Sequence, residues 1–297
     1  MIKYIDAKHI LHKNKTTDWF GANYCVNLYR GCCHGCIYCD SRSECYQDTD
    51  FDIVKPKKNA IQILELELQH KRKSGIIDTG AMSDPYNPLE KNLKLTRQFL
   101  YLAKKYEFGV SITTKGTLIE RDIDILQEIS LFSPVICQIS ITTPNDMQSS
   151  ILEPYAPLSS QRFYTLSKLA NANIFSGIVM MPILPFLEDT EENVLSIVKI
   201  AAEKGARFIY PYFGVTLRQN QKDYYFQKLK ESFPKYNYAE QYIKNYGNQY
   251  ECLSLQHSEL KFLFENECNK YGILFEMDRI VSEYQKKYYK RQLSLFE

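Results

Sequence analysis

The stretch "YCVNLYRGCCHGCIYCD", residues 24–40, joins an apolar run to a loop that holds four cysteines within eight positions. Three of them, Cys32, Cys36 and Cys39, follow the spacing C-x3-C-x2-C, and Cys33 lies outside it. The run "YCVNLY" is typical of a short strand that delivers the chain into the loop. We therefore expect the cysteines at the carboxyl end of a strand.

The same order of strand and helix repeats along the chain, with apolar residues at helical spacing between the strands. Apolar runs predict strands within residues 24–29, 75–84, 108–116, 134–143, 174–182 and 206–215. Continuously apolar strands separated by helices are typical of a parallel sheet with right-handed crossovers. The fold class expected is α/β, a partial (βα)6 TIM-type barrel with a C-terminal helical extension.

A chain of 297 residues with 44% hydrophobic content can bury one barrel core. We expect an N-terminal segment at 1–18, the barrel at 19–218, a helical extension at 219–290 and a tail at 291–297. Chemistry in such barrels gathers at the carboxyl ends of the strands. The cysteine loop, Ser83, Lys115 and Pro182 all follow strands and should share one rim.

Composition restricts the functional class. No apolar run is long enough to cross a bilayer and no secretion signal is visible, so a cytoplasmic protein without a membrane partner is expected. Nine cysteines in such a chain favour metal binding or chemistry over disulfides. A net charge of +2 is too small to attract nucleic acid to the whole surface, so any such contact should be local.

Closely spaced thiolates can hold zinc or an iron-sulfur cluster. Structural zinc sites usually use two separated ligand pairs, whereas this chain has one compact trio. Zinc completed by His34, Cys33 or Cys45 stays open as an alternative. Burial as a small hydrophobe suits Cys137 and Cys268 better than it suits a glycine-rich loop.

With an aromatic residue before its last cysteine, the trio resembles the radical S-adenosylmethionine (SAM) superfamily. The wider "NLYRGCCHGCIYC" is similar to the spore photoproduct lyase-like, DNA repair photolyase-like branch, over about residues 19–218. The resemblance implies a 4Fe-4S cluster whose metal ligands and catalytic residues are Cys32, Cys36 and Cys39. SAM would occupy the open iron through its amino and carboxylate groups, and one electron would break its S–C5′ bond to give a 5′-deoxyadenosyl radical.

The resemblance also assigns residues to SAM binding: Tyr38, Ser83, Asp84, Lys115, Ser140, Glu153, Arg162 and Met181. Lys115 falls at the position that binds the SAM carboxylate. On physical grounds alone, Ser-Asp-Pro is also a common turn or helix cap. Glu153 and Arg162 fit a ligand clamp or a surface salt bridge equally well.

The chain departs from the lyase at the residues that relay hydrogen atoms. Ala81 stands where the lyase has a cysteine, and Asp40 where it has a tyrosine. A later Arg-Tyr-Gly corresponds to "NYG", which keeps Tyr246 as a catalytic candidate but has Asn245 in place of the arginine. Methyl and carboxylate groups cannot relay hydrogen atoms. Substitute donors to consider are Cys25, Cys33, Cys45, Tyr210 and Tyr212.

The segment "QLSLF", residues 292–296, resembles the peptide that bacterial replication and repair proteins insert into the sliding clamp. Its contact residues would be Gln292, Leu293, Leu295 and Phe296. We favour this hypothesis because the helical pattern stops where the peptide begins, and the tail would then tether the protein to DNA. The alternative is an amphipathic helix packed on the barrel, since Ile280, Tyr284 and Tyr288 recur at helical spacing.

Together these patterns predict a lyase-like radical SAM enzyme that acts on DNA or a DNA-associated substrate, in repair or modification. It would take its electron from a reductant such as flavodoxin or ferredoxin. One alternative is a radical SAM enzyme that acts on RNA, a peptide or a small molecule. The other is a zinc-stabilised nucleic-acid-binding module without catalysis.

Overall fold

The structure is a computed structural model that describes residues 2–46, 48 and 50–293, with side chains described through residue 288. Within these residues the central sheet has seven strands in the order β1-β2-β5-β6-β7-β8-β9. Their bounds are β1 Leu11–Lys13, β2 Tyr24–Val26, β5 Ile76–Thr79, β6 Gly109–Thr114, β7 Val135–Ser140, β8 Ser176–Met180 and β9 Ile209–Pro211. Strand β1 is antiparallel to β2, and all later pairs are parallel. The six parallel strands confirm the predicted partial barrel.

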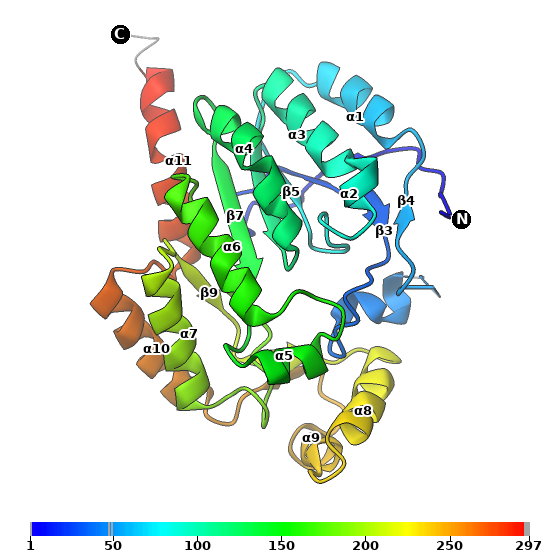
Figure 1. Ribbon diagram of the computed structural model, residues 1–297, viewed down its shortest axis with the longest axis vertical. Coiled ribbons are helices and arrows are strands. Elements are labelled where there is room, and N and C mark those ends of the chain that lie inside the picture. Colours follow the sequence, from blue (N-terminus) through cyan, green and yellow to red (C-terminus); the bar gives the residue numbers. More distant parts are fainter. Residues whose placement is uncertain (1, 47, 49, 294–297) are drawn as a thin grey trace.

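Amphipathic helices cover the outer face of the sheet (Figure 1). The main crossover helices are α1 Ala60–Gln69, α3 Leu95–Lys105, α4 Ile123–Ser130, α6 Ser159–Asn171 and α7 Glu191–Glu203. Outward strand residues such as Ile77, Ile112 and Ile178 are fully buried against the apolar faces of these helices in one core. Cys137 belongs to this core and is fully buried, as the sequence predicts.

Shorter elements fill the connections between strands and helices. They are β3 Tyr29–Arg30, η1 Asp40–Arg42, η2 Glu44–Tyr46, β4 Lys55–Pro56, α2 Glu90–Leu93, η3 Thr117–Asp122 and α5 Asp146–Leu152. The strand predicted at residues 24–29 is thus two strands, because β3 leaves the barrel sheet to pair with β4. No helix among the described residues is both long and apolar enough to span a bilayer.

The sixth helix that packs on the barrel comes from the C-terminal extension. The extension comprises α8 Gln221–Ser232, α9 Tyr238–Tyr246, β11 Glu251–Leu253 and α10 His257–Tyr271. Helix α10 packs beside α7, and Leu274 after it bridges to Phe208 at the start of β9. The last predicted strand, residues 206–215, was wrong as one element. It breaks after Pro211, which has no N–H for the ladder, and β10 (Gly214–Thr216) turns away to pair with β11.

Helix α11 (Met277–Leu293) closes the floor of the barrel. Ile280 and Tyr284 are buried against Phe20 and Phe208, and the Tyr284 hydroxyl donates to the carbonyl of Phe20 at 2.6 Å. The packed-helix alternative is therefore correct for these two residues. The expectation that the helix stops where the "QLSLF" segment begins was wrong, because α11 includes Gln292 and Leu293. Leu295 and Phe296 lie outside the described residues.

Candidate functional site

The cysteine loop begins at a position that only glycine can occupy. Gly31 has φ +78°, and a Cβ there would lie 2.3 Å from the carbonyl oxygen of Ile53. The next amide, of Cys32, donates to the carbonyl of Phe51 at 2.7 Å, and Ser83 Oγ donates to the Gly31 carbonyl at 2.5 Å. Hydrogen bonds from the Cys32 amide and the Ser83 side chain therefore fix the start of the loop.

We expect Gly31→Ala to lower the free energy of unfolding by about 2–3 kcal/mol, since it adds a backbone clash to a strained φ. Gly272→Ala is the matched control, because Gly272 also has positive φ but no atom within 4 Å of an added Cβ. The control should lose about 1 kcal/mol. Urea unfolding measures both, and equal losses would show that the close approach at Gly31 is unimportant.

The three cysteines of the C-x3-C-x2-C pattern are free thiols in this loop. Burial raises the pKa of Cys32 to about 12, and burial likewise raises the pKa values of Cys36 and Cys39. The cation of Lys115 opposes this rise at Cys36 and Cys39. Metal binding must therefore displace the thiol protons, as it does in other thiolate sites.

Among the described residues, no three His, Cys, Asp or Glu side chains converge on a point that could hold one metal ion. In a 4Fe-4S cluster, each of three cysteines would bind a different iron of the same compact group.

A buried charge network lies beside the loop and is centred on Glu153. Its carboxylate accepts hydrogen bonds from the hydroxyl of Tyr38 and the guanidinium of Arg162, and the Nζ of Lys115 lies 3.6 Å from Oε1. Glu153 and Arg162 are each only 1% exposed. The surface salt bridge that the sequence left open is therefore wrong for this pair, because both partners are in the interior.

This network holds more positive charges than negative ones. Burial alone would raise the pKa of Glu153, but Arg162 and Lys115 outweigh burial and hold that pKa below its usual value. One carboxylate thus faces two cations, and a lysine ammonium has three N–H donors. The network can accept a further anionic group, such as a carboxylate or an iron-sulfur cluster with its thiolates.

Asp84 links the carboxyl ends of β5 and β6. Its carboxylate accepts from the amide of Tyr86 at 2.8 Å, from Thr114 Oγ1 at 2.6 Å and from the amide of Lys115 at 2.8 Å. The bond to Tyr86 is the local turn contact that the sequence allowed. The other two bonds fix the carboxylate at the rim beside Lys115.

His34 lies between the first two cysteines of the pattern and is 4% exposed. Burial lowers its pKa, although Asp84 opposes that change. Its Nε2 lies 3.4 Å from Oδ2 of Asp84, yet neither ring nitrogen makes a hydrogen bond within the described residues. The sequence marks His34 only as a possible zinc ligand.

The remaining predicted SAM residues and Tyr246 occupy different surroundings. The carbonyl of Ser140, at the end of β7, accepts from Arg162 Nη1 at 2.8 Å. Met181 packs partly buried beside the aromatic floor of the barrel. Tyr246 ends α9, and its buried hydroxyl donates to the carbonyl of Leu253 at 2.5 Å. It belongs to the same apolar cluster as Cys36 and Tyr38, and its catalytic role stays a prediction.

Residues that sequence patterns did not identify tie the cysteine loop to the extension. Arg218 Nε donates to Asp40 Oδ1 at 2.9 Å, and Gln221 Nε2 donates to the carbonyl of Tyr38 at 2.9 Å. Arg218 also lines a cavity of about 430 Å³ that includes the exposed Cys45. These contacts join residues up to 183 positions apart, so no local pattern could have indicated them.

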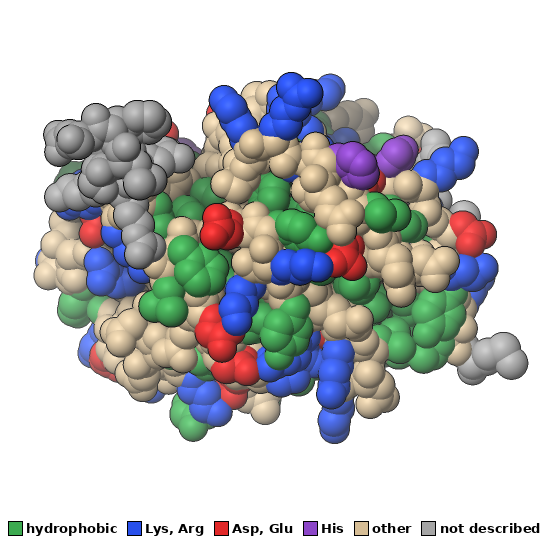
Figure 2. All heavy atoms as spheres, turned by 90° about the horizontal axis from the view of Figure 1, so that it is seen from above, with side chains coloured by type: hydrophobic (Ala, Val, Ile, Leu, Met, Phe, Trp, Pro, Cys, Tyr) green, Lys and Arg blue, Asp and Glu red, His purple; other side chains and the backbone are tan. Residues whose placement is uncertain are grey.

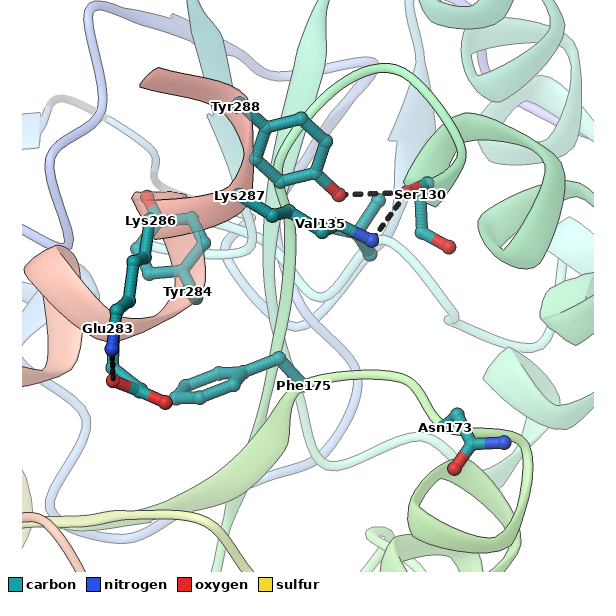
Figure 3. A pocket seen from close by; sticks show the side chains of 9 residues that line it. All are labelled: Ser130, Val135, Asn173, Phe175, Glu283, Tyr284, Lys286, Lys287 and Tyr288. Carbon is teal, nitrogen blue, oxygen red and sulfur yellow. Dashed lines mark hydrogen bonds and ion pairs between the residues drawn. The ribbon is translucent and has the colours of Figure 1, made fainter. Parts of the chain in front are cut away.

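A separate cavity of about 400 Å³ lies between α11 and the starts of β7 and β8 (Figure 3). Lys287 Nζ and the Tyr288 hydroxyl each donate to the carbonyl of Ser130 at 2.7 Å there. Because it lies at the amino ends of the strands, this cavity is at the opposite end of the barrel from the cysteines.

Comparison with known proteins gives three kinds of similarity. The family model described as "Radical SAM superfamily" matches residues 26–201. An uncharacterized protein of Mycobacterium tuberculosis is 28% identical over 235 residues, which cover 77% of this chain and 69% of the relative. One from Methanocaldococcus jannaschii is 32% identical over 175 residues, covering 58% of this chain and 64% of the relative.

Solved structures of spore photoproduct lyase are similar in fold. A mutant of that enzyme gives a TM-score of 0.64 at 15% identity, covering 92% of this chain and 80% of the other. The lyase complexed with dinucleoside spore photoproduct gives 0.63 at 15% identity, covering 90% and 79%.

Proposed function

Since the chain belongs to the radical SAM superfamily, we propose that it directs the 5′-deoxyadenosyl radical to DNA or a DNA-associated substrate. The protein is an enzyme, and its cofactors are a 4Fe-4S cluster and SAM. When bound, these cofactors supply the reactive radical. The protein contributes binding, orientation and exclusion of water.

The cofactor assignment rests on one observation, which is that the cysteine loop and the buried charge network lie side by side at the same end of the barrel. Cys32, Cys36 and Cys39 would hold the cluster, and the network of Glu153, Arg162 and Lys115 lies directly beside them. The unbalanced cation of Lys115 suits the carboxylate of SAM. Burial of these charges excludes water, which strengthens every polar contact they make.

The nucleic-acid substrate is supported by the extent of the structural similarity. It covers 92% of the chain and so continues beyond residue 201, where the family match ends, into the helical extension. One of the similar lyase structures holds a dinucleoside lesion. Acidic and basic side chains are interspersed on the face in Figure 2, which fits a local contact better than a continuous basic track.

Ala81 and Asp40 indicate that the hydrogen relay differs from that of the lyase. Asp40 accepts from Arg218 and from the Tyr46 hydroxyl, so its carboxylate serves to anchor the loop. The proposal therefore includes both reversal of a DNA lesion and modification of a base. A donor other than the lyase's relay residues would return the hydrogen atom to the substrate.

The test is anaerobic turnover with SAM, a reductant such as flavodoxin or ferredoxin, and genomic DNA. We expect 5′-deoxyadenosine to form faster with DNA than without it, together with a changed nucleoside detected by mass spectrometry. RNA, peptide pools and small-molecule extracts are the comparison substrates. Stimulation by one of these and not by DNA would overturn the DNA proposal while leaving the enzyme class intact.

We further propose that the "QLSLF" segment contacts the bacterial sliding clamp through Gln292, Leu293, Leu295 and Phe296. Because α11 includes the first two of these residues, its last turn would have to unwind to give an extended peptide. Deletion of residues 292–296 should abolish retention on immobilised clamp. Retention that survives the deletion would refute this contact.

A further inference from the structure

The imidazole of His34 is a buried polar group whose ring nitrogens make no hydrogen bond to the part of the chain that the structure describes. It is 4% exposed, and neither Nδ1 nor Nε2 forms a hydrogen bond within the described residues. A buried donor or acceptor left unsatisfied destabilises the folded protein. A bound group that supplies the missing partner would remove this destabilisation.

The surroundings of His34 indicate which bound group that is. The charges that act on its ring are those of Asp84, Lys115, Glu153 and Arg162, the side chains assigned to SAM. Its backbone carbonyl accepts the amide of Tyr155 at 3.0 Å, which fixes this part of the loop. With its Nε2 3.4 Å from Oδ2 of Asp84, the ring also lies beside one of the residues assigned to SAM.

The tautomer follows from the carboxylate beside the ring. A neutral imidazole has one N–H donor and one nitrogen acceptor. Oδ2 of Asp84 lies 3.4 Å from Nε2, and this carboxylate accepts hydrogen bonds from its other neighbours. Nε2 must then carry the proton, and a small ring movement would complete its bond to Asp84. Nδ1 is left as an acceptor, so its partner must be a donor.

We propose that His34 positions SAM by accepting a hydrogen bond from its α-amino group at Nδ1 while donating to Asp84 at Nε2. Of the two groups of SAM that would bind at the open iron, the α-carboxylate can only accept a hydrogen bond, whereas the amino group can donate one. This role rests on the SAM-binding function proposed above and is independent of the DNA substrate.

The test measures SAM affinity on the anaerobically reconstituted full-length enzyme without DNA. His34→Phe removes both nitrogens and should raise the dissociation constant of SAM about 10–100-fold. His34→Asn offers an amide oxygen close to the position of Nδ1 and should recover most of that affinity. His12→Phe, at an exposed histidine, is the control and should change nothing. Iron content and the reduction potential without SAM should stay at wild-type values in all three variants.

Two analogues identify the group that His34 contacts. Wild-type enzyme should bind desamino-SAM more weakly than SAM, and His34→Phe should lose about tenfold or more of that preference. The His34→Phe variant should still bind SAM more tightly than decarboxylated SAM.

A variant that weakens SAM and desamino-SAM equally would show a merely structural role and overturn the proposal. The proposal would also be overturned if His34→Phe no longer preferred SAM over decarboxylated SAM. A reduction potential that differs from the wild-type value in the absence of SAM would overturn it too. Failure of the wild-type enzyme to bind SAM would instead contradict the proposed function.

Discussion

Cys36→Ala will abolish the brown colour of the reconstituted protein and its release of 5′-deoxyadenosine from SAM. The change leaves only Cys32 and Cys39 of the pattern, and two thiolates cannot hold the three irons that need protein ligands. Iron and sulfide analysis, absorbance and product chromatography under anaerobic conditions measure the effect. The loss should be complete within detection.

Cys33→Ala is the matched control for this experiment. Cys33 is a free thiol in the same loop but lies outside the C-x3-C-x2-C spacing, so iron content and SAM cleavage should be retained. A Cys36→Ala protein with wild-type iron content would contradict the assignment of the cluster. Loss of iron in Cys33→Ala would mean that the ligand set has been chosen wrongly.

Glu153→Gln will have the largest effect on stability of the isolated protein. The change leaves the buried cations of Arg162 and Lys115 without their carboxylate, and breaking a buried ion pair costs about 3–5 kcal/mol. The amide can still accept from Tyr38, so the loss reports the charge. Urea unfolding of the metal-free protein gives the free energy directly.

Glu128→Gln supplies the comparison at the surface. It removes the exposed pair that Glu128 forms with Lys104 at 2.6 Å, and such pairs contribute about 0–1 kcal/mol. The interior position of Glu153 should therefore separate the two variants by at least about 2 kcal/mol. Equal losses would place Glu153 in solvent and remove the basis for a buried cofactor site.

The barrel could be predicted because its strands and helices are encoded locally. Helix α6 has the bounds that the apolar spacing of residues 159–171 indicates. The four middle predicted strands, residues 75–84, 108–116, 134–143 and 174–182, each contain one whole barrel strand. The exit of β10 from the barrel could not be predicted, since its partner β11 lies over thirty residues later in the sequence. The same holds for α10, whose role as the sixth barrel helix depends on packing beside α7.

The site was predictable only where a motif marks it. The spacing of Cys32, Cys36 and Cys39 is such a motif. The burial of Glu153 and Arg162 is set by tertiary packing, so a clamp and a surface pair could not be distinguished from the sequence. The same holds for His34, because only the assembled strands show that its ring nitrogens make no hydrogen bond among the residues described.

The closure of the barrel floor by α11 has a consequence for biogenesis. Tyr284 and Ile280 complete the core around Phe20, so the last helix packs against a residue that precedes the first parallel strand. During translation, the cysteine loop emerges from the ribosome some 240 residues before this helix does. The floor of the barrel therefore stays open until α11 has been synthesised, long after the cysteine loop has been made.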